Sequence, residues 1–515
     1  MNKLKKYGLP LVLSSILLVG GCGLSKNYEV DYTDIAKVKN DSSKAAVHDP
    51  SIIEADGIYY IFGSHLSAAK STDMQNWEMM TSVQNAYSKN NPVYTDMNNL
   101  GTEEFAFTGN GASEIPTDDK GTHIWAPDVI YNKANNKYFM YYCTSSTFNA
   151  STIVYATSNK IEGPYEWQGN LLYSGETAQN LDKTDILNYV DRDYAEKNYT
   201  AKAGYEYNFK DYPNCIDPTV FYDKDGKMWM VYGSWSGGIF LIEIDEKTGN
   251  VIHPQADPKN NVDPYYGKRL IGGGHNSIEA PYILYDAESD YYYLFVSYGE
   301  LTRDGGYQIR VFRSDKVDGD YVDMNQRAPK KGMAHADTGL KLSGNYHLPS
   351  LEVGYKATGH NSAFIDQDGR KYVAYHTRFD KASEQHTPKV KQYLLNAEGW
   401  PCLLPYTTSG EQVSATGYDK KEVVGRYYYI NQGTAIDANV ATPDILYLNS
   451  NGEVKGEGIS GTWEQTEDTY FMTLNIDGKE YSGIFCKMQD EAGTEVMTFS
   501  AVGSNESVWG VKYDK

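Results

Sequence analysis

The sequence predicts an all-β protein: a five-bladed β-propeller followed by a smaller β-barrel-like domain. The first observation behind this prediction is composition, because 46 of the 515 residues are tyrosine and 47 are glycine, which are strand and turn formers. The second is a repeat, in which a strand, a turn and an aromatic strand follow one another five times. Apolar residues at helical spacing form almost no long runs, which also favours strands.

The five copies of this repeat define the predicted blades, and each is expected to be a hairpin. Their turns read "ADG", "KANN", "KDG", "AESD" and "QDG", which are typical of β-hairpins. The copies begin at His48, Trp125, Ile216, Ile278 and His360. A repeat of this size, with several strands and no helices in each unit, is typical of a propeller, whereas a β-sandwich would lack it.

The repeats also divide the chain into segments. We expect a signal peptide at 1–21, a tether at 22–45, the propeller at 46–407, a linker at 408–421 and the second β domain at 422–515. A long polar and aromatic insertion at 170–212 lies between the second and third blades. Long loops on propellers usually shape one face, so we expect the insertion to do so.

The N-terminal segment Met1–Gly21 combines lysines, a short apolar run and small residues, which is typical of a targeting signal. Its end, "LLVGGC", resembles a bacterial lipobox, in which Cys22 would become lipidated. The alternative is an ordinary secretory signal with an incidental cysteine. Either signal places the mature chain outside the cytoplasm, as a cell-surface lipoprotein or a secreted protein.

Charge and cysteine content exclude some classes of function. The net charge is −21, and removal of Met1–Gly21 would take away three lysines and leave 44 basic against 68 acidic side chains. This balance argues against nucleic acid as a partner. The remaining cysteines, widely spaced and without a C-x-x-C pair, predict neither a zinc site nor a disulfide framework. They are Cys143, Cys215, Cys402 and Cys486.

Alignment of the five copies predicts a ring of side chains at one end of the central channel. When the copies are aligned on their proline, with Ser362 in its place in the fifth, one slot holds Asp49, Ala126, Asp217, Ala280 and Asn361. The slot before it holds His48, Trp125, Ile216, Glu279 and His360. Equivalent positions in successive blades are related by rotation about the axis, so these residues should meet. The two His-Asn-Ser stretches, at 275–277 and 360–362, are likewise expected to be blade-equivalent.

Three carboxyl groups in this ring, those of Asp49, Asp217 and Glu279, point to acid and base chemistry. Like charges that converge in a cleft raise one another's pKa values. Glycoside hydrolysis needs such a set, because one carboxylic acid protonates the leaving oxygen while a carboxylate activates water. Taken singly, an aspartate before proline is often a turn device, Glu279 could be a surface residue and His360 a core histidine. Their joint occurrence at repeat positions favours a catalytic site.

Residues 46–407 resemble glycoside hydrolase family 43, and within it the secreted arabinanases. The resemblance is carried by "HDP", "IWAPDV", "CIDPTVFYDKDGKMWMVYGSWSGGI", "IEAPYILY", "GHNS", "YHTRF", "EQH" and "GWP". It implies that Asp49 is the general base, that Glu279 is the general acid, and that Asp217 tunes the pKa of the acid and orients it. His360 matches the histidine that reaches a metal in the channel, usually calcium, with water completing the shell.

The resemblance also implies inversion of configuration, which needs room for a water molecule between two carboxyl groups roughly 6.5–9.5 Å apart. We further predict that Trp125, Asn214 and Ser234 bind substrate, with Trp125 as an aromatic wall for a sugar ring; core packing is the alternative for Trp125. The C-terminal β domain resembles the smaller domain that is appended to one branch of the arabinanases.

The sequence therefore predicts a monomeric, extracellular enzyme that cleaves internal α-1,5-L-arabinofuranosyl linkages of arabinan by one-step inversion. One alternative is a relative that acts on chain ends, such as an exo-arabinanase, an α-L-arabinofuranosidase or a β-xylosidase, since a loop such as 170–212 could close the cleft. The other is a catalytically silent carbohydrate-binding lipoprotein. Such a binding protein would be free to lose the three acids, and all three are present.

Overall fold

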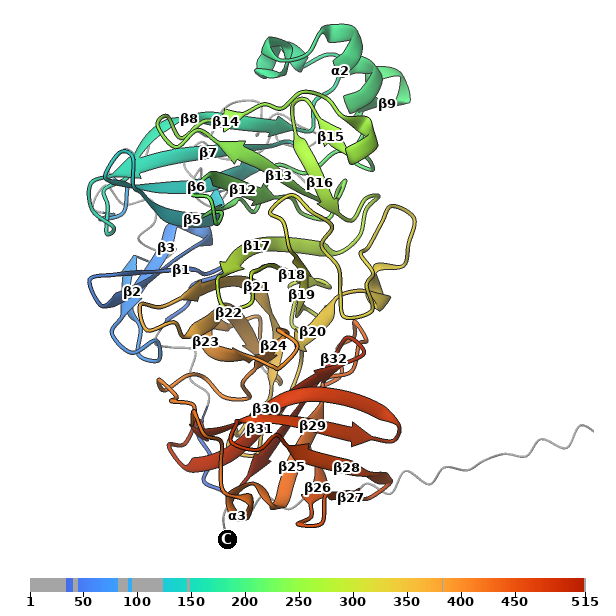
Figure 1. The fold of residues 1–515 in the computed structure, drawn as a ribbon. Coiled ribbons are helices and arrows are strands. Elements are labelled where there is room, and N and C mark those ends of the chain that lie inside the picture. Colours follow the sequence, from blue (N-terminus) through green and yellow to red (C-terminus); the bar gives the residue numbers. More distant parts are fainter. Residues whose placement is uncertain are drawn as a thin grey trace, which may run out of the picture.

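The computed structural model describes residues 34–39, 45–81, 91–94, 124–145, 149–381 and 383–513. Five β-sheets surround one axis, and a closed eight-stranded barrel follows them (Figure 1). The predicted fold class, a five-bladed propeller with a smaller C-terminal β domain, is confirmed. The predicted signal peptide and Cys22 lie outside the described residues. None of the described helices is both long and apolar enough to cross a membrane.

Blades one, two, four and five are antiparallel four-stranded sheets in chain order. Blade one contains β1 (Ser51–Ala55), β2 (Ile58–Gly63), β3 (Ser67–Ser71) and β4 (Glu78–Thr81). Blade two contains β5 (Ile124–Asn132), β6 (Lys137–Ser145), β7 (Ser151–Ser158) and β8 (Glu166–Ser174). Blade four contains β17 (Ile278–Asp286), β18 (Tyr291–Tyr298), β19 (Gln308–Ser314) and β20 (Leu340–Ser343). Blade five contains β21 (Tyr355–Ile365), β22 (Lys371–Phe379), β23 (His386–Leu395) and β24 (Pro401–Leu403).

Blade three is larger. It contains β11 (Thr219–Tyr222), β12 (Met228–Tyr232), β13 (Ile239–Ile244), β14 (Val251–Ile252), β15 (Val262–Asp263) and β16 (Gly267–Ile271). Here β16 pairs with β13, so that Ile271 lies opposite Ile239, and β15 forms the outer edge. The end of β16 is therefore at the same face of the propeller as the start of β13.

The predicted hairpins are the first two strands of each blade. In blade one, Ala55 pairs with Ile58 across Asp56 and Gly57, whose φ angles of 53° and 76° are those of a type I′ turn. The aromatic second strands are buried along most of their length, because neighbouring blades cover both of their faces. This explains why tyrosine and phenylalanine, rather than alternating polar residues, fill these strands.

The ring closes through contacts between the innermost strands, β1, β5, β11, β17 and β21, with β21 returning to β1. Ser362 of blade five donates to the carbonyl oxygen of Pro50 at 2.8 Å and accepts the backbone N–H of Ile52 at 3.2 Å. Between blades two and three, Asp128 accepts the backbone N–H of Val220 at 2.7 Å. Burial raises the pKa of Asp128 to about 7. Polar side chains thus join blades that share no sheet.

Part of the predicted tether packs against the propeller. Ile35 is buried, and Val38 forms a parallel bridge with Leu351, donating to the carbonyl oxygen of Ser350 at 2.8 Å. Ala45 belongs to the buried cluster between blades one and five. The described residues before β1 therefore help to seal the ring where its first and last blades meet.

The insertion between blades two and three begins later than predicted. Residues 170–174 belong to β8, so the insertion starts after Ser174. It contains α2 (Arg192–Tyr199), a helix that the sequence analysis did not predict, which is capped by Asp191 accepting the backbone N–H of Tyr194. Two short strands follow, β9 (Thr200–Ala201) and β10 (Glu206–Tyr207). In Figure 1 the insertion lies at the end of the molecule remote from the barrel.

The C-terminal barrel closes by pairing of β25 with β32. Its strands are β25 (Gly425–Asn431), β26 (Asp444–Leu448), β27 (Glu453–Gly456), β28 (Ile459–Gln465), β29 (Phe471–Ile476), β30 (Lys479–Gln489), β31 (Glu495–Gly503) and β32 (Glu506–Lys512). A short helix, α3 (Lys420–Val423), precedes them. The predicted linker is packed rather than free, since Thr408 donates to the carbonyl oxygen of Val390 and Glu411 is buried.

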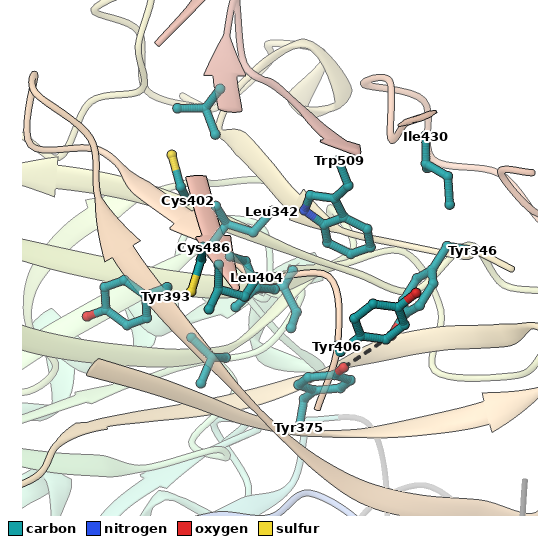
Figure 2. Close-up of a cluster of buried hydrophobic side chains, with 14 of the residues drawn as sticks. Leu342, Tyr346, Tyr375, Tyr393, Cys402, Leu404, Tyr406, Ile430, Cys486 and Trp509 are labelled. Atoms are coloured by element: carbon teal, nitrogen blue, oxygen red, sulfur yellow. Dashed lines mark hydrogen bonds between the residues drawn. The ribbon is translucent and has the colours of Figure 1, made fainter. Parts of the chain in front are cut away.

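The propeller and the barrel share a hydrophobic core, which Figure 2 shows. Trp509 of the barrel packs edge-on against Tyr346 of the propeller, with 5.1 Å between ring centroids. Lys391 lies over the Trp509 ring at 4.2 Å and donates to the carbonyl oxygen of Pro405 at 2.7 Å. The cysteines in the described residues are free and buried, and two of them, Cys402 and Cys486, lie in this core.

Candidate active site

One slot of the predicted ring, with His360 from the other, lines a cavity between the blades, whereas Glu279 and Trp125 lie outside its lining. The fifth blade is shifted by one position relative to the prediction. The first strands of blades two, four and five each contain a two-residue bulge, at 126–127, 280–281 and 360–361. At or just before the first strand of each blade, one equivalent non-glycine residue has a positive φ: Asp49, Ala126, Asp217, Ala280 and His360. His360, not Asn361, is therefore equivalent to Asp49, and Asn361, not Ser362, takes the place of the proline. The predicted alignment of this blade was wrong by one residue.

These positive φ angles, between 44° and 55°, place five non-glycine residues in the left-handed region. Such backbone strain costs about 1–3 kcal/mol per residue and collects at functional sites. Aspartate tolerates this region better than most residues do. The conformation, repeated in every blade, is what makes Asp49, Asp217 and His360 line one cavity.

Asp49 is held by two histidines and a serine. Its carboxylate lies 2.8 Å from Nδ1 of His48 and 3.0 Å from Nδ1 of His360, and it accepts the Ser64 hydroxyl. Burial alone would raise the pKa of Asp49, but the charges and hydrogen bonds of His360 and His48 hold it well below its usual range. Asp49 is therefore ionised at neutral pH, as a base must be.

A second layer of residues fixes the histidines around Asp49. His48 stacks on His376 with 4.1 Å between ring centroids. Arg378 contacts Nε2 of His376 at 3.0 Å and Nε2 of His48 at 3.3 Å. These contacts hold both rings in place beside Asp49, and Nδ1 of His376 also lies 3.3 Å from the backbone nitrogen of Asp49. The sequence analysis quoted "YHTRF", which contains His376 and Arg378, but assigned no role to either residue.

Asp217 and Glu279 approach each other through the backbone. Asp217 precedes β11, and its Oδ2 atom accepts the N–H of Ala280, the residue after Glu279, at 3.1 Å. Burial raises the pKa of Asp217 to about 7; the charge of His360 opposes this shift, while Glu279 and Asp49 add to it. The carboxyl group of Asp217 thus titrates near neutral pH because it is buried beside other acids.

Three side chains hold the carboxylate of Glu279. Tyr307 donates to Oε1 at 2.6 Å, while the indole N–H of Trp235 and the hydroxyl of Ser234 donate to Oε2 at 2.8 and 3.2 Å. Ser234 was predicted as a substrate-binding residue, and the structure places it against Glu279. Trp235 and Tyr307 were missed. The motif "SWSGG" at 234–238 contains Trp235 and could have indicated it. Nothing distinguishes Tyr307 from the other tyrosines in the sequence.

The two other predicted substrate-binding residues lie at different depths. Trp125, in β5, is half-buried and packs against the core shared by blades two and three. Asn214 is buried, and its Oδ1 atom accepts the hydroxyl of Ser151 at 2.8 Å. Its carbonyl oxygen accepts the N–H of Ile216, so Asn214 shapes the turn that leads into Asp217.

The two His-Asn-Ser stretches are not equivalent, contrary to the prediction. His360 lines the channel, whereas His275 lies outside it, with its ring 5.4 Å from that of Trp235 and 5.6 Å from that of Phe209. Phe209 belongs to the insertion. The ring of His275 thus lies between Phe209 of the insertion and Trp235, which donates a hydrogen bond to Glu279.

The predicted calcium ion can be tested against the chemistry of the donors. Nδ1 of His360 contacts Asp49, and no hydrogen bond to another described residue involves Nε2. Asp49 and Asp217 line the same cavity as His360. Since Ca²⁺ takes about six to eight oxygen ligands, water would have to supply most of the shell. The residues therefore fit an ion held by one imidazole and largely by water.

A tighter group of possible ligands consists of His48, Asp49 and His376. The guanidinium group of Arg378 faces the Nε2 atoms of both histidines, and its positive charge opposes a cation there. This group is better described as the support of Asp49 than as a metal site.

Comparison with known proteins agrees with this geometry. The family "Glycosyl hydrolases family 43" matches residues 39–208 and 190–401, and a "C-terminal lipocalin-like domain" matches residues 405–510. Extracellular endo-alpha-(1->5)-L-arabinanase 2 of Bacillus subtilis is 38% identical over 488 residues, which are 91% of this chain and 93% of the relative. The extracellular endo-alpha-(1->5)-L-arabinanase of Thermotoga petrophila is 37% identical over 490 residues, 92% of this chain and 94% of the relative.

A solved structure extends the agreement to the whole fold. The crystal structure of endo-1,5-alpha-L-arabinanase from Thermotoga petrophila RKU-1 has a TM-score of 0.77 and 35% identity, with 93% of this chain and 100% of that chain covered. The family match spans the entire propeller, and the relatives span both domains. The resemblance predicted from the sequence is confirmed, and this chain belongs to glycoside hydrolase family 43.

Proposed function

We propose that this chain is an extracellular endo-acting arabinanase, which cleaves internal α-1,5-L-arabinofuranosyl linkages of arabinan with inversion. The observation that carries the proposal is the convergence of Asp49, Asp217 and Glu279 from three blades, each with different partners. Relatives that are 37–38% identical along nine-tenths of the chain are named endo-arabinanases, which supports the same bond and the same mode of attack.

In this proposal Asp49 is the general base. Because His48 and His360 hold its pKa low, Asp49 enters the reaction ionised and accepts a proton from water as the water attacks the anomeric carbon. The water adds from the face opposite the leaving oxygen, which inverts the configuration in one step. Ser64 fixes the carboxylate by donating to it, so that the accepting oxygen is already oriented.

Glu279 is the general acid. It transfers its proton to the glycosidic oxygen as the bond to the anomeric carbon breaks, and ends the reaction as a carboxylate. The hydroxyl of Tyr307 and the indole N–H of Trp235 stabilise that carboxylate and hold its orientation. Asp217 acts through charge, since it lies beside the backbone of Glu279 and titrates near neutral pH. Solvent then reprotonates Glu279 and deprotonates Asp49.

A calcium ion at Nε2 of His360 is part of the proposal. When bound, such an ion would order channel water and fix the imidazole that contacts Asp49. We also propose that the chain acts as a monomer, and that Cys22, if lipidated, tethers it to the cell surface. The substrate-binding roles of Trp125, Asn214 and Ser234 remain predictions.

The test compares two substrates and two variants. On linear arabinan, Glu279→Gln should lose about 10²–10⁴-fold in kcat, because a sugar alkoxide leaves poorly without a proton. An activated aryl arabinofuranoside should be largely spared in Glu279→Gln, whereas Asp49→Asn should lose activity on both substrates. Glu464→Gln, on an exposed position of β28, is the control and should match the wild type.

Product analysis tests the mode of attack. Oligomers of mixed length early in the digest support endo action, whereas a single released sugar or dimer from the start would contradict it. Near-normal cleavage of arabinan by both acid variants would overturn the assignment of the site and favour the binding-protein alternative.

A further inference from the structure

A cavity outside the catalytic channel lies between β16 of blade three and residues 319–331 of blade four. Its volume is about 540 Å³, which is the size of a site for a small saccharide. We name it the basic pocket, because its lining includes Lys259, Lys268, Arg269, Lys330 and Lys331 against a single acid, Asp320. A concentration of positive charge is unexpected in a chain whose net charge is −21.

Much of this charge is uncompensated. Lys331 pairs with Asp211, and Lys268 lies 3.8 Å from a carboxylate oxygen of Asp318. Among the described residues, no carboxylate lies within ion-pair distance of Lys259, Arg269 or Lys330. The guanidinium group of Arg269 is already engaged, since it lies over the ring of Phe240 and near the carbonyl oxygen of Gly237. Lys259 and Lys330 are exposed and have no fixed counter-charge, so they would bind an anion at little cost in breaking existing pairs.

The remainder of the lining selects the kind of anion. Leu270 and Ala328, which are half-buried, supply apolar surface, and amide side chains lie beside them at Asn260, Asn261 and Gln326. The aromatic residue in the lining, Tyr321, is fully buried, so it offers no exposed ring on which a nucleobase could stack. Apolar patches, amides and cations together match a sugar ring that carries hydroxyls and a carboxylate.

The basic pocket adjoins the catalytic site through one short segment, residues 235–238. Arg269 lies with a guanidinium nitrogen 3.5 Å from the carbonyl oxygen of Gly237, and a Cβ on Gly272 would come within 2.9 Å of the Cα of Gly238. The same segment begins with Trp235, which donates to Glu279. A polysaccharide held in the basic pocket would thus present neighbouring chains to the catalytic cleft.

We propose that the basic pocket binds a uronate residue of an acidic polysaccharide and so holds the enzyme on material that also carries its substrate. The link to arabinan rests on the proposed function, but binding of the uronate does not. The carboxylate would sit between Lys259 and Lys330, and the sugar ring against Leu270 and Ala328. Binding should weaken as salt is added, since screened surface charges supply much of the attraction.

The experiment is isothermal titration calorimetry of the full chain with a galacturonate tetramer. The variant Lys259→Glu/Lys330→Glu reverses two exposed charges and should weaken binding by at least about tenfold, which is about 1.4 kcal/mol. Lys247→Glu reverses an exposed charge elsewhere on blade three and should leave binding within about twofold of the wild type. A neutral arabinose tetramer and inorganic phosphate are titrated in parallel.

Binding of the tetramer that is lost in the double variant and kept in Lys247→Glu supports the proposal. Absence of binding, equal loss in both variants, or binding of phosphate in place of the tetramer would overturn it. Hydrolysis of neutral linear arabinan should be unchanged in the double variant. If the wild type bound the tetramer but never cleaved arabinan, the proposed function would fail while the uronate site stood.

Discussion

Replacement of Asp217 by asparagine should move the alkaline limit of the enzyme. Burial and the neighbouring acids raise the pKa of Asp217 to about 7, whereas Asp49 titrates far below neutral pH. Asp217 touches the backbone next to Glu279. Asp217 is one of several acids that lie close together, so the site loses a proton near pH 7, and we expect this loss to set the alkaline limit of activity.

The magnitude follows from this titration. Above pH 7 the kcat/KM of the wild type on arabinan should fall about tenfold per unit, so activity at pH 9 should be about 100-fold below that at pH 6. Asp217→Asn removes one negative charge from the cleft. Two like charges about 5–10 Å apart at an effective dielectric constant of about 20 repel by about 1.7–3 kcal/mol, so the alkaline limb of the pH profile should move by at least about one unit to lower pH.

Initial rates on linear arabinan between pH 5 and pH 9 measure the effect, with melting temperatures taken at each pH to exclude unfolding. An activated aryl arabinofuranoside is the control, because its leaving group departs without a proton and its profile should lack the limb. An identical alkaline limb in wild type and Asp217→Asn would show that Asp217 does not govern the proton of the acid.

The other two predictions concern stability. If His360 holds calcium, a chelator should lower the melting temperature, calcium should restore it, and His360→Gln should respond to neither; an unchanged wild-type melting temperature would remove the ion from the proposal. Glu176 is buried, with one oxygen accepting from Tyr266 and the other without a partner, and burial raises its pKa from 4.5 to about 8. Its contribution to stability is therefore present below about pH 4.5 and lost as the pH rises towards 8, so Glu176→Gln should be more favourable at pH 9 than at pH 5 by on the order of 3 kcal/mol. Urea unfolding at the two pH values measures this difference, and equal effects at both would contradict the buried, protonated state.

The propeller and the three acids could be predicted from the sequence because both belong to a repeated hairpin pattern. A hairpin pattern that recurs five times constrains the rotation between its copies, and Asp49 and Asp217 therefore fell correctly into one slot. The error at His360 has a physical cause. Blade five has no proline at this position, so the alignment lacked its anchor, and the two-residue bulge at 360–361 has no signature in the sequence.

Residues that reach the acids or their partners from loops or from distant strands could not be predicted in this way. Tyr307 lies in the loop between β18 and β19 and contacts Glu279 of the same blade. Arg378 contacts His48, which is 330 residues away in the sequence. Neither contact has a periodic signal, because each depends on how side chains pack once the ring has closed. The helix α2 was missed for a related reason, since its stability comes from tyrosines packed against blade three rather than from an apolar stripe of its own.

The repeated positive-φ residue that forms the site lies close in sequence to the side chains that hold the blades together. The five equivalent positive-φ residues line the channel, and in four of the blades a polar side chain two positions later bonds to a neighbouring blade. Ser362 bonds to Pro50, Thr219 donates to the carbonyl oxygen of Pro281 at 2.7 Å, and Asp128 accepts from Val220. Because chemistry and ring closure are two residues apart on one strand, the blades cannot shift without moving the acids. This coupling explains how a site assembled from separate blades keeps the fixed geometry that proton transfer requires.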